Sequence, residues 1–319
     1  MTYPWYTHSE YLKKRFGQSV YRIGVDAGFS CPNRNCDRSG GCIYCDGTGA
    51  VAVYQREEEK SGERSEKAFL ERLESIEKQI ERGKRFIHYR YKANLASLYF
   101  QSWSNTFAPV ERLKKIYDHA LSLGDFCELV VSTRPDLLDD EVCALLESYQ
   151  TQNRDVWVEV GLQSANDETL RKINRGHDRE CYIRSIERLH HHGLKVCTHL
   201  LLMPCFDRRK TYLDAIELLN ALKVEAVKIH NLHITYHTEL ERAFLEDGCI
   251  SPSSISRHVE DVALMLSHLH SECIVERLLA ETTKARLLCP RHFPDKRDIL
   301  EMIAKKMAQN GWVQGSEVK

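Results

Sequence analysis

Four cysteines near the beginning of the chain are the residues best suited to chemistry. Cys31, Cys36, Cys42 and Cys45 fall within 15 residues, whereas the other eight of the 12 cysteines are scattered singly from Cys127 onward. A cluster of this kind is typical of a metal site. Its spacing suits a four-cysteine zinc site and also an iron–sulfur cluster, so both interpretations stay open on the cysteines alone. A thioredoxin-type redox pair is disfavoured, because no strand–CxxC–helix unit is evident there.

A second set of polar residues lies in a run with strand-like alternation, Val156 to Gln163. One face of this strand would carry Glu159, Gly161 and Gln163, and the other face would be aliphatic. The aliphatic face suits packing against helices. We therefore expect Glu159, Gln163 and the following Ser164 to line the inside of a barrel, near its mouth.

Two ionisable residues share one face of a later candidate strand. Lys228 and His230 are two positions apart in Ala226 to Ile234. Ionisable groups that point into a barrel are costly unless they are paired or used. This indicates that Lys228 and His230 are catalytic residues that contact the substrate; the alternative is a structural hydrogen-bond network.

The elements that would position these residues alternate along the chain. Helical apolar patterns separate six candidate strands, an order typical of parallel β/α units. We therefore predict an α/β fold, a partial (β/α)6 TIM-like barrel that falls short of the eight units of a full barrel. The candidate strands are Tyr21–Ala27, Leu98–Gln101, Glu128–Thr133, Val156–Gln163, Lys195–Met203 and Ala226–Ile234.

The end of the chain has a different pattern. A helical run from Ile255 to Leu269 precedes an apolar stretch from Cys273 to Leu279 and a second helix from Asp298 to Asn310. We predict a barrel domain over residues 1–250 and a C-terminal α/β extension over residues 251–319 that packs on it.

Composition and charge exclude several classes of protein. Lys and Arg number 45 against 46 Asp and Glu, so a globally basic nucleic-acid binder is excluded and no DNA partner is expected. No apolar run approaches the length of a membrane span, and the first residues contain no apolar signal-peptide core. We expect no membrane partner and a cytoplasmic location.

Several segments together resemble the radical S-adenosylmethionine (SAM) superfamily, and most closely its YhcC/YtqA-type bacterial proteins. They span roughly residues 10–290 and are GFSCPNR, GGCIYC, STRPD, VWVEVGLQSANDETLRKINRGHD, GLKVCTHLL and VKIHNLH. The usual cysteine spacing of three and two residues is expanded here to ten and two, similar to the Elongator catalytic-subunit branch. The resemblance implies that Cys31, Cys42 and Cys45 hold a [4Fe–4S] cluster with one iron open to SAM. Cys36 would be a bystander or a fourth ligand that closes the site.

The resemblance also implies which residues contact SAM. Glu159, Gln163 and Ser164 would lie near it, joined by Gln101 and Ser102 at the end of the second strand. The family's Gly-Leu-Pro-Gly-Glu turn near the adenine is replaced by Met203-Pro204-Cys205-Phe206-Asp207, in which only Pro204 is retained. The missing glycines make close backbone approach harder. A barrel that keeps the cluster but lacks SAM activity therefore stays open.

The function that the resemblance implies is cleavage of SAM to a 5′-deoxyadenosyl radical that takes hydrogen from a substrate. A flavodoxin- or ferredoxin-type electron donor would be the partner. The likeness to the Elongator branch suggests a tRNA wobble-uridine side chain as substrate. The basic and aromatic run Arg82 to Lys92 would suit phosphate contact and base stacking, or it would form a solvated helix end. A zinc-stabilised, non-catalytic RNA-binding protein is the competing hypothesis.

Overall fold

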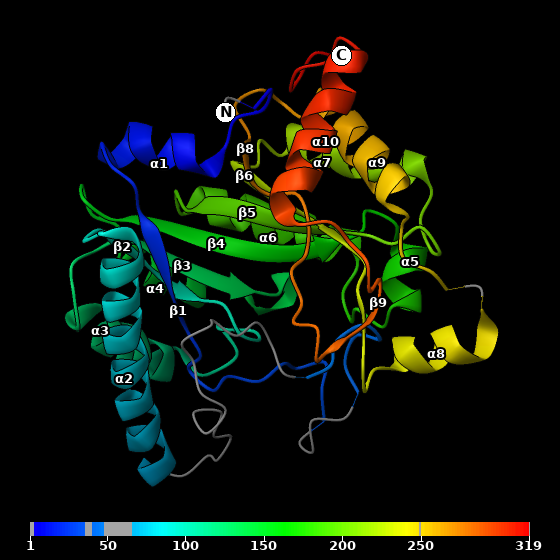
Figure 1. Cartoon of the computed structure of the whole chain (residues 1–319). Coiled ribbons are helices and arrows are strands. Elements are labelled where there is room, and N and C mark those ends of the chain that lie inside the picture. The colour runs from blue at the N-terminus through cyan, green and yellow to red at the C-terminus, as the bar shows by residue number, and fades with distance from the viewer. Residues whose placement is uncertain (1–2, 36–39, 48–65, 249, 319) are drawn as a thin grey trace.

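A single parallel sheet organises the molecule. The computed structural model describes residues 3–35, 40–47, 66–248 and 250–318. Seven strands pair in the order β1-β2-β3-β4-β5-β6-β8, each parallel to its neighbours, and the sheet curls into a half-barrel (Figure 1). The strands of this sheet are β1 (Tyr21–Val25), β2 (Ala96–Phe100), β3 (Phe126–Thr133), β4 (Asp155–Gln163), β5 (Lys195–Leu202), β6 (Ala226–Asn231) and β8 (Ile274–Arg277).

Helices follow the strands and return the chain to the edge where the next strand begins. Six of the described helices begin at a side-chain cap that accepts hydrogen bonds from first-turn N–H groups: Thr7, Asp139, Asn166, Asp178, Thr238 and Ser254. The helices are α1 (His8–Phe16), α2 (Glu66–Tyr91), α3 (Val110–Ser122), the 3-10 helix η2 (Pro135–Leu137), α4 (Asp140–Glu147), α5 (Asp167–Lys172), α6 (Arg179–His191), α7 (Arg209–Ala221), α8 (Glu239–Asp247), α9 (Ile255–His268) and α10 (Lys296–Gln309). A small antiparallel pair, β7 (Ile234–Thr235) with β9 (Leu287–Cys289), stands apart from the main sheet.

The predicted partial barrel is confirmed, with one strand more than expected. The seventh strand, β8, lies in the segment that we assigned to the C-terminal extension, and it pairs in parallel with β6. The extension therefore completes the sheet as well as packing on it. The proposed domain boundary at residue 250 stays a prediction.

The two faces of the curled sheet carry different cores. Val156, Val158 and Val160 of β4 belong to the large apolar core beneath the outer helices. Trp157 of the same strand belongs to a smaller cluster inside the curl, with Cys197 as a neighbour. The alternation predicted for β4 is thus confirmed.

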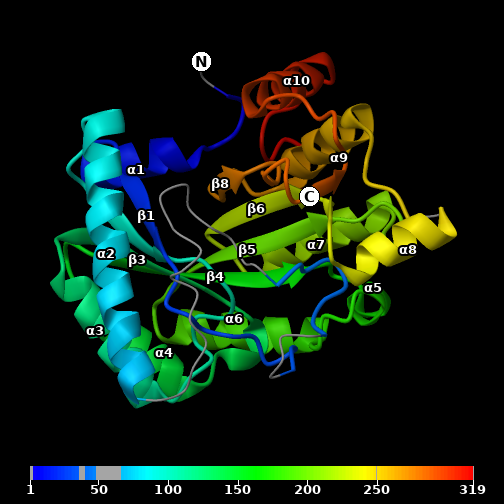
Figure 2. The ribbon, with the colours of Figure 1, turned by 60° about the horizontal axis from the view of Figure 1, so that its bottom comes forward.

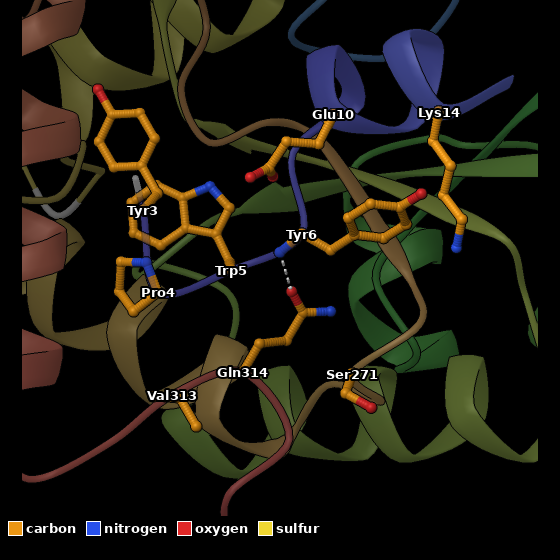
Figure 3. A pocket seen from close by; sticks show the side chains of 9 residues that line it. All are labelled: Tyr3, Pro4, Trp5, Tyr6, Glu10, Lys14, Ser271, Val313 and Gln314. Atoms are coloured by element: carbon orange, nitrogen blue, oxygen red, sulfur yellow. Dashed lines mark hydrogen bonds between the residues drawn. The ribbon is translucent and has the colours of Figure 1, made fainter. Parts of the chain in front are cut away.

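Both ends of the chain pack near the edge where the strands begin. Thr7, just before α1, forms a bridge with Val275 of β8. The backbone N–H of Tyr6 donates to Oε1 of Gln314 at 2.8 Å (Figure 3). Nε2 of Gln314 donates in turn to the carbonyls of His270 and Cys273, at 2.7 Å each. The opposite edge, where the strands end, comes forward in Figure 2.

Within the described residues, no helix is long and apolar enough to cross a membrane.

Candidate active site

The segment after β1 carries the clustered cysteines of the sequence analysis. We call its described residues, 28–35 and 40–47, the cysteine loop. One backbone and one side-chain hydrogen bond tie this loop to the segment after α5. The N–H of Ile43 donates to the Ile173 carbonyl at 3.1 Å, and Nδ2 of Asn174 donates to the Gly41 carbonyl at 2.7 Å. The loop also accepts from α8, where the Leu240 N–H reaches the Ile43 carbonyl at 2.9 Å.

Arg175 stands at the centre of this junction. It is buried, with 7% of its surface exposed. Its Nη2 donates to the carbonyl of Gly161 on β4 at 2.7 Å, and its Nη1 lies 3.7 Å from the sulfur of Cys42. Burial opposes ionisation of the Cys42 thiol, but the Arg175 charge and hydrogen bonds from Arg175 and Tyr44 outweigh it, so the pKa of Cys42 is lowered. A lowered pKa favours the thiolate that a metal requires.

Two of the three predicted ligands, Cys31 and Cys42, lie near this guanidinium. Cys42 is buried, and Cys31 and Cys45 are half-buried. Burial opposes the charge of Arg175, but negative charges nearby, those of the Cys31 and Cys42 thiolates among them, raise its pKa. In the described part of the chain, no three His, Cys, Asp or Glu side chains are already arranged to hold a metal ion. Cys36 lies outside the described residues. The thiols of Cys31 and Cys42 beside a buried cation nevertheless suit thiolate ligands of an iron–sulfur cluster, because the cation offsets thiolate charge.

Gly161 lets β4 pass close to Arg175. A Cβ atom at this position would lie 2.6 Å from Nη2 of Arg175 and 2.5 Å from Nε2 of Gln163, so any other residue would require these two side chains to shift. The strand register shifts between Gly161 and Gln163, and Gln163 adopts a left-handed backbone with φ of 73°. The predicted SAM residue Gln163 therefore sits at a bulge beside Arg175, where its amide group lies against Gly161.

Glu159 lies deeper in the curl, in a group that we call the ionic layer: Arg22, Glu159, Lys228 and Glu276. Nζ of Lys228 is 2.6 Å from Oε1 of Glu159, and Nη1 of Arg22 is 3.0 Å from the same oxygen. Glu276 of β8 lies 2.9 Å from Arg22 and 3.4 Å from Lys228. Burial raises the pKa of Glu159, but the charges of Lys228 and Arg22 hold it well below its ordinary value. The charges of two carboxylates and two cations, contributed by four strands, thus balance one another. Their side chains fill the interior of the barrel beneath its mouth.

His230 is the predicted catalytic residue that stands nearer the mouth. It follows Lys228 by two positions on β6, so it lies one step closer to the edge where the strands end. Its Nε2 is buried and has no hydrogen-bond partner, and its ring lies 5.5 Å from that of His199. Burial, and then the neighbouring positive groups, hold the pKa of His230 well below its ordinary value. The structure therefore gives a neutral imidazole a free ring nitrogen inside the curl, whereas Lys228 is already ion-paired.

Gln101 and Ser102 stand at the end of β2, as predicted. Ser102 is completely buried and Gln101 is half-buried. The Gln101 amide lies over Gly24 of β1, where a Cβ atom would meet Nε2 at 3.0 Å. This brings Gln101 to the strand whose end leads into the cysteine loop.

The turn after β5 is held by hydrogen bonds to the start of α5. Oγ1 of Thr169 donates to Oδ1 of Asp207 at 2.6 Å, and Ser164 also hydrogen-bonds to this carboxylate. Burial raises the pKa of Asp207. Ser164 is buried, with its oxygen accepting from the Asn166 N–H at 3.1 Å. Asp207 thus ties the turn that contains Pro204 to the end of β4, where Gln163 and Ser164 lie.

The basic run Arg82 to Lys92 forms the C-terminal end of α2. Tyr91 stacks on Tyr21, the first residue of β1, with ring centroids 4.3 Å apart. The run therefore lies at the edge where the strands begin, opposite the cysteine loop (Figure 1). Lys84 is used internally, because its ammonium donates to the Leu123 carbonyl.

Sequence reasoning missed Arg175 and two members of the ionic layer, Arg22 and Glu276. Arg175 stands in the quoted segment LRKINRGHD, so a charged residue directly before a glycine was the available signal. Arg22 and Glu276 lie in short strands more than 250 residues apart, and no local pattern connects them.

Comparisons with known proteins agree on one family. The model of the radical SAM superfamily matches residues 31–219, and the model of the Radical_SAM C-terminal domain matches residues 224–309. Protein YhcC of Escherichia coli (strain K12) is 32% identical over 306 residues, which cover 96% of this chain and 92% of YhcC. The uncharacterized protein YtqA of Bacillus subtilis (strain 168) is 30% identical over 312 residues, which cover 98% of this chain and 92% of YtqA.

Two solved structures share the fold. The archaeal Elp3 of Methanocaldococcus infernus superposes with a TM-score of 0.61 at 18% identity; the match covers 76% of this chain and 60% of that one. Methylornithine synthase (PylB) superposes with a TM-score of 0.51 at 10% identity, over 96% of this chain and 87% of that one. At these identities the likeness concerns the fold alone.

Proposed function

Because this chain belongs to the radical SAM superfamily, we propose that it is an enzyme that cleaves SAM and removes a hydrogen atom from a substrate. A [4Fe–4S] cluster and SAM are the cofactors of the superfamily. When bound, they supply an electron and a 5′-deoxyadenosyl radical, which does the hydrogen abstraction. A flavodoxin- or ferredoxin-type donor would provide the electron.

The observation that carries this proposal is the position of the Cys42 thiol. It is buried against the Arg175 guanidinium, at the end of the parallel strands, where barrel enzymes hold their active sites. In the proposed site Cys31, Cys42 and Cys45 are the cluster ligands. Arg175 places a fixed positive charge beside them and also anchors the loop to Gly161 of β4.

The remaining residues are proposed to shape the mouth. Gln163, Ser164, Gln101 and Ser102 stand at strand ends and offer polar groups for SAM, and Pro204 lies in the turn tied to Ser164. Glu159 belongs to the ionic layer, so we propose that it sets the floor of the site. A substrate would then bind at the mouth of the barrel, where the neutral imidazole of His230 has a ring nitrogen free for a hydrogen bond.

Replacement of single cysteines tests the ligand set. Cys31→Ala, Cys42→Ala and Cys45→Ala should each lose the iron and sulfide that the wild-type protein takes up in anaerobic reconstitution, because a three-ligand site has no spare thiolate. Cys36→Ala should keep most of its iron, and Cys181→Ala, outside the loop, serves as control. Complete loss in Cys36→Ala would contradict the three-ligand site. A colourless wild-type protein that retains zinc would favour the competing zinc-stabilised RNA-binding protein.

For the substrate we propose a tRNA wobble-uridine side chain, on the resemblance to the Elongator branch. The exposed charges of Arg85, Arg90 and Lys92, with Tyr89 between them at 74% exposure, would hold RNA phosphates and a base. Because this run lies opposite the cysteine loop, it would hold a part of the RNA far from the reacting nucleoside.

Two measurements test the RNA substrate. Changing Arg85, Arg90 and Lys92 together to Ala should weaken tRNA binding and reduce its dependence on salt, because fewer counterions are released. Three exposed charges elsewhere, Arg184, Lys210 and Arg297, provide a matched triple control. Nucleoside mass spectrometry of tRNA from a deletion strain should show a changed wobble uridine. An unchanged profile with no tRNA affinity would exclude this substrate.

A further inference from the structure

A cavity of about 890 Å³ lies outside the curled sheet, near the ends of the strands. It is bounded by the loop after β1 and by the beginnings of α2, α3 and α4, which lie side by side in Figure 2. Its volume is in the range of sites for small molecules and cofactors. Because it lies among the outer helices, it is separate from the interior of the curl. We call it the arginine cavity after Arg72 and Arg112, which line it.

Both arginine side chains are half-buried, and each has guanidinium nitrogens without a hydrogen-bond acceptor. Nε of Arg72, and Nε and Nη2 of Arg112, are buried and have no hydrogen-bond partner. Burial lowers the pKa of Arg72, and the charge of Arg112 lowers it further, opposed by Asp26. Arg112 also lies over the Phe69 ring, 4.5 Å from its centroid. Buried donors that lack an acceptor are costly, so this pair is arranged for an anion that brings acceptors with it.

The acidic groups that line the cavity do not neutralise this pair. Asp136 is bound by Arg134, whose Nε lies 2.8 Å from Oδ1. Asp139 caps α4 and accepts the Val142 N–H at 2.8 Å. Glu111 and Glu141 are exposed. Neither Arg72 nor Arg112 makes a salt bridge within the described part of the chain.

The start of α3 adds to the positive potential. The N-cap of this 13-residue helix is Pro109, which has no side chain that accepts a hydrogen bond, so first-turn N–H groups are left without a side-chain partner. Helix N-termini of this kind favour phosphate and carboxylate groups. The helix end and the two guanidiniums face the same cavity.

An exposed aromatic ring completes the lining. Phe107, just before α3, is 41% exposed and lines the cavity together with the buried Phe29. An exposed phenyl ring beside two guanidiniums is the combination that holds a base by stacking and a phosphate by charged hydrogen bonds. We propose that the arginine cavity binds a nucleotide, with its phosphate on Arg72 and Arg112 and its base on Phe107. The site does not depend on the radical chemistry proposed above: Phe29 belongs to the cysteine loop, but none of the residues proposed to bind the cluster or SAM lines this cavity.

Calorimetric titration of the isolated full-length protein with uridine 5′-monophosphate tests the site, without SAM or reductant. Uridine should bind at least about tenfold more weakly, because it lacks the charged hydrogen bonds. Arg72→Gln and Arg112→Gln should each weaken binding of the monophosphate by about tenfold, and Phe107→Ala should weaken it less. Lys78→Gln, also on α2 but exposed and outside both the cavity and the basic run, should bind like wild type. A short oligouridylate that binds more tightly than the monophosphate would identify an RNA segment as the source; equal affinity would identify a free nucleotide.

The stability of the variants separates a binding role from a structural one. Without ligand, Arg112→Gln should melt at or above the wild-type temperature, because it removes one of two neighbouring half-buried positive charges that make no salt bridge in the described part of the chain. The rise in melting temperature that the monophosphate gives the wild-type protein should be lost in this variant. Equal binding of uridine and its monophosphate, wild-type affinity in the arginine variants, or a large fall in the melting temperature of ligand-free Arg112→Gln would each overturn the proposal.

Discussion

Arg175 is a single residue that contacts both parts of the site, β4 of the barrel and the cysteine loop. Its guanidinium holds the Gly161 carbonyl of β4 and lies beside the Cys42 sulfur, so one side chain connects the barrel to the cysteine loop. A buried charge that is exchanged for an uncharged group leaves its former partners unpaired. Replacement of Arg175 should therefore weaken cluster binding by the cysteines more than it destabilises the fold.

Arg175→Met keeps much of the side-chain volume but removes the charge and the hydrogen bonds. We expect it to retain less than half of the wild-type iron after reconstitution and to shift the cluster's reduction potential to more negative values, because a nearby positive charge favours the reduced state. Arg175→Lys should recover part of both properties. Iron analysis and an electron paramagnetic resonance titration measure them. Wild-type iron content and potential in Arg175→Met would show that this charge is not part of the site.

Glu128 gives a pH-dependent prediction. This carboxyl is fully buried on β3, and burial raises its pKa from 4.5 to about 6. A raised pKa in the folded state stabilises the fold at pH values below the unfolded pKa, and this contribution is lost as pH rises through about 6.

Glu128→Gln should therefore raise the free energy of unfolding by about 2 kcal/mol at pH 8 and leave it nearly unchanged near pH 4.5. Urea unfolding at the two pH values measures the difference, with Glu141→Gln, an exposed carboxyl, as the control. A variant less stable than wild type at pH 8 would show that the charged form of Glu128 is used.

At this scale the cysteines and the alternating residues of β4 were predictable, and Arg175 was not. The spacing of the clustered cysteines can be recognised within a short stretch of sequence. Alternation along β4 likewise assigns Trp157 and Glu159 to one face from the sequence alone. The partner of Arg175 is a thiol 133 residues away, and no local pattern reports such a pairing. The bulge at Gln163 was also unpredictable, because it is a shift in the pairing of β4 with β5, which no local pattern shows.

At the scale of elements, the strand at the end of the sheet contributes to the interior of the barrel. β8 supplies Glu276, which lies 2.9 Å from Arg22 of β1 and 3.4 Å from Lys228 of β6. The ionic layer therefore joins the first and last strands of the half-barrel. Without β8, two buried cations would share the single carboxylate of Glu159, a costly arrangement.

A chain that ends at residue 250 should therefore not fold as a monomer. It would expose the edge of β6 and leave the ionic layer unbalanced. In the full chain, Glu276→Gln should lower the free energy of unfolding by about 3–5 kcal/mol. Size-exclusion chromatography and thermal unfolding measure both effects. A monomeric fragment with a cooperative transition would instead support an independent domain over residues 1–250.

The six predicted strands were found because alternation and helical spacing are local, whereas β8 was missed as part of the sheet. Its four residues, Ile274–Arg277, form too short a run to show a period. What places β8 is its pairing with β6 and the bridge from Thr7, contacts between distant segments. The basic run of α2 was recognised from composition, but its position at the opposite edge required the fold.

In the molecule as a whole, different segments gather at the two edges of the sheet, the one where the strands begin and the one where they end. α1 and the last residues of the chain pack at the edge where the strands begin, and the cysteine loop, Gln163 and the turn with Pro204 gather where they end. This division agrees with the general placement of active sites in barrels. We propose that the second edge cleaves SAM, although Met203 to Asp207 lacks the glycines expected there.

Formation of 5′-deoxyadenosine tests this claim most directly. The protein is reconstituted anaerobically, its iron is counted, and it is incubated with SAM and dithionite before chromatography and mass spectrometry. We predict that the wild-type protein and Cys181→Ala form 5′-deoxyadenosine and methionine in equal amounts, and that Cys42→Ala forms neither. A wild-type protein that carries its full cluster yet forms no 5′-deoxyadenosine would contradict the account and identify a barrel that has kept the cluster without the chemistry.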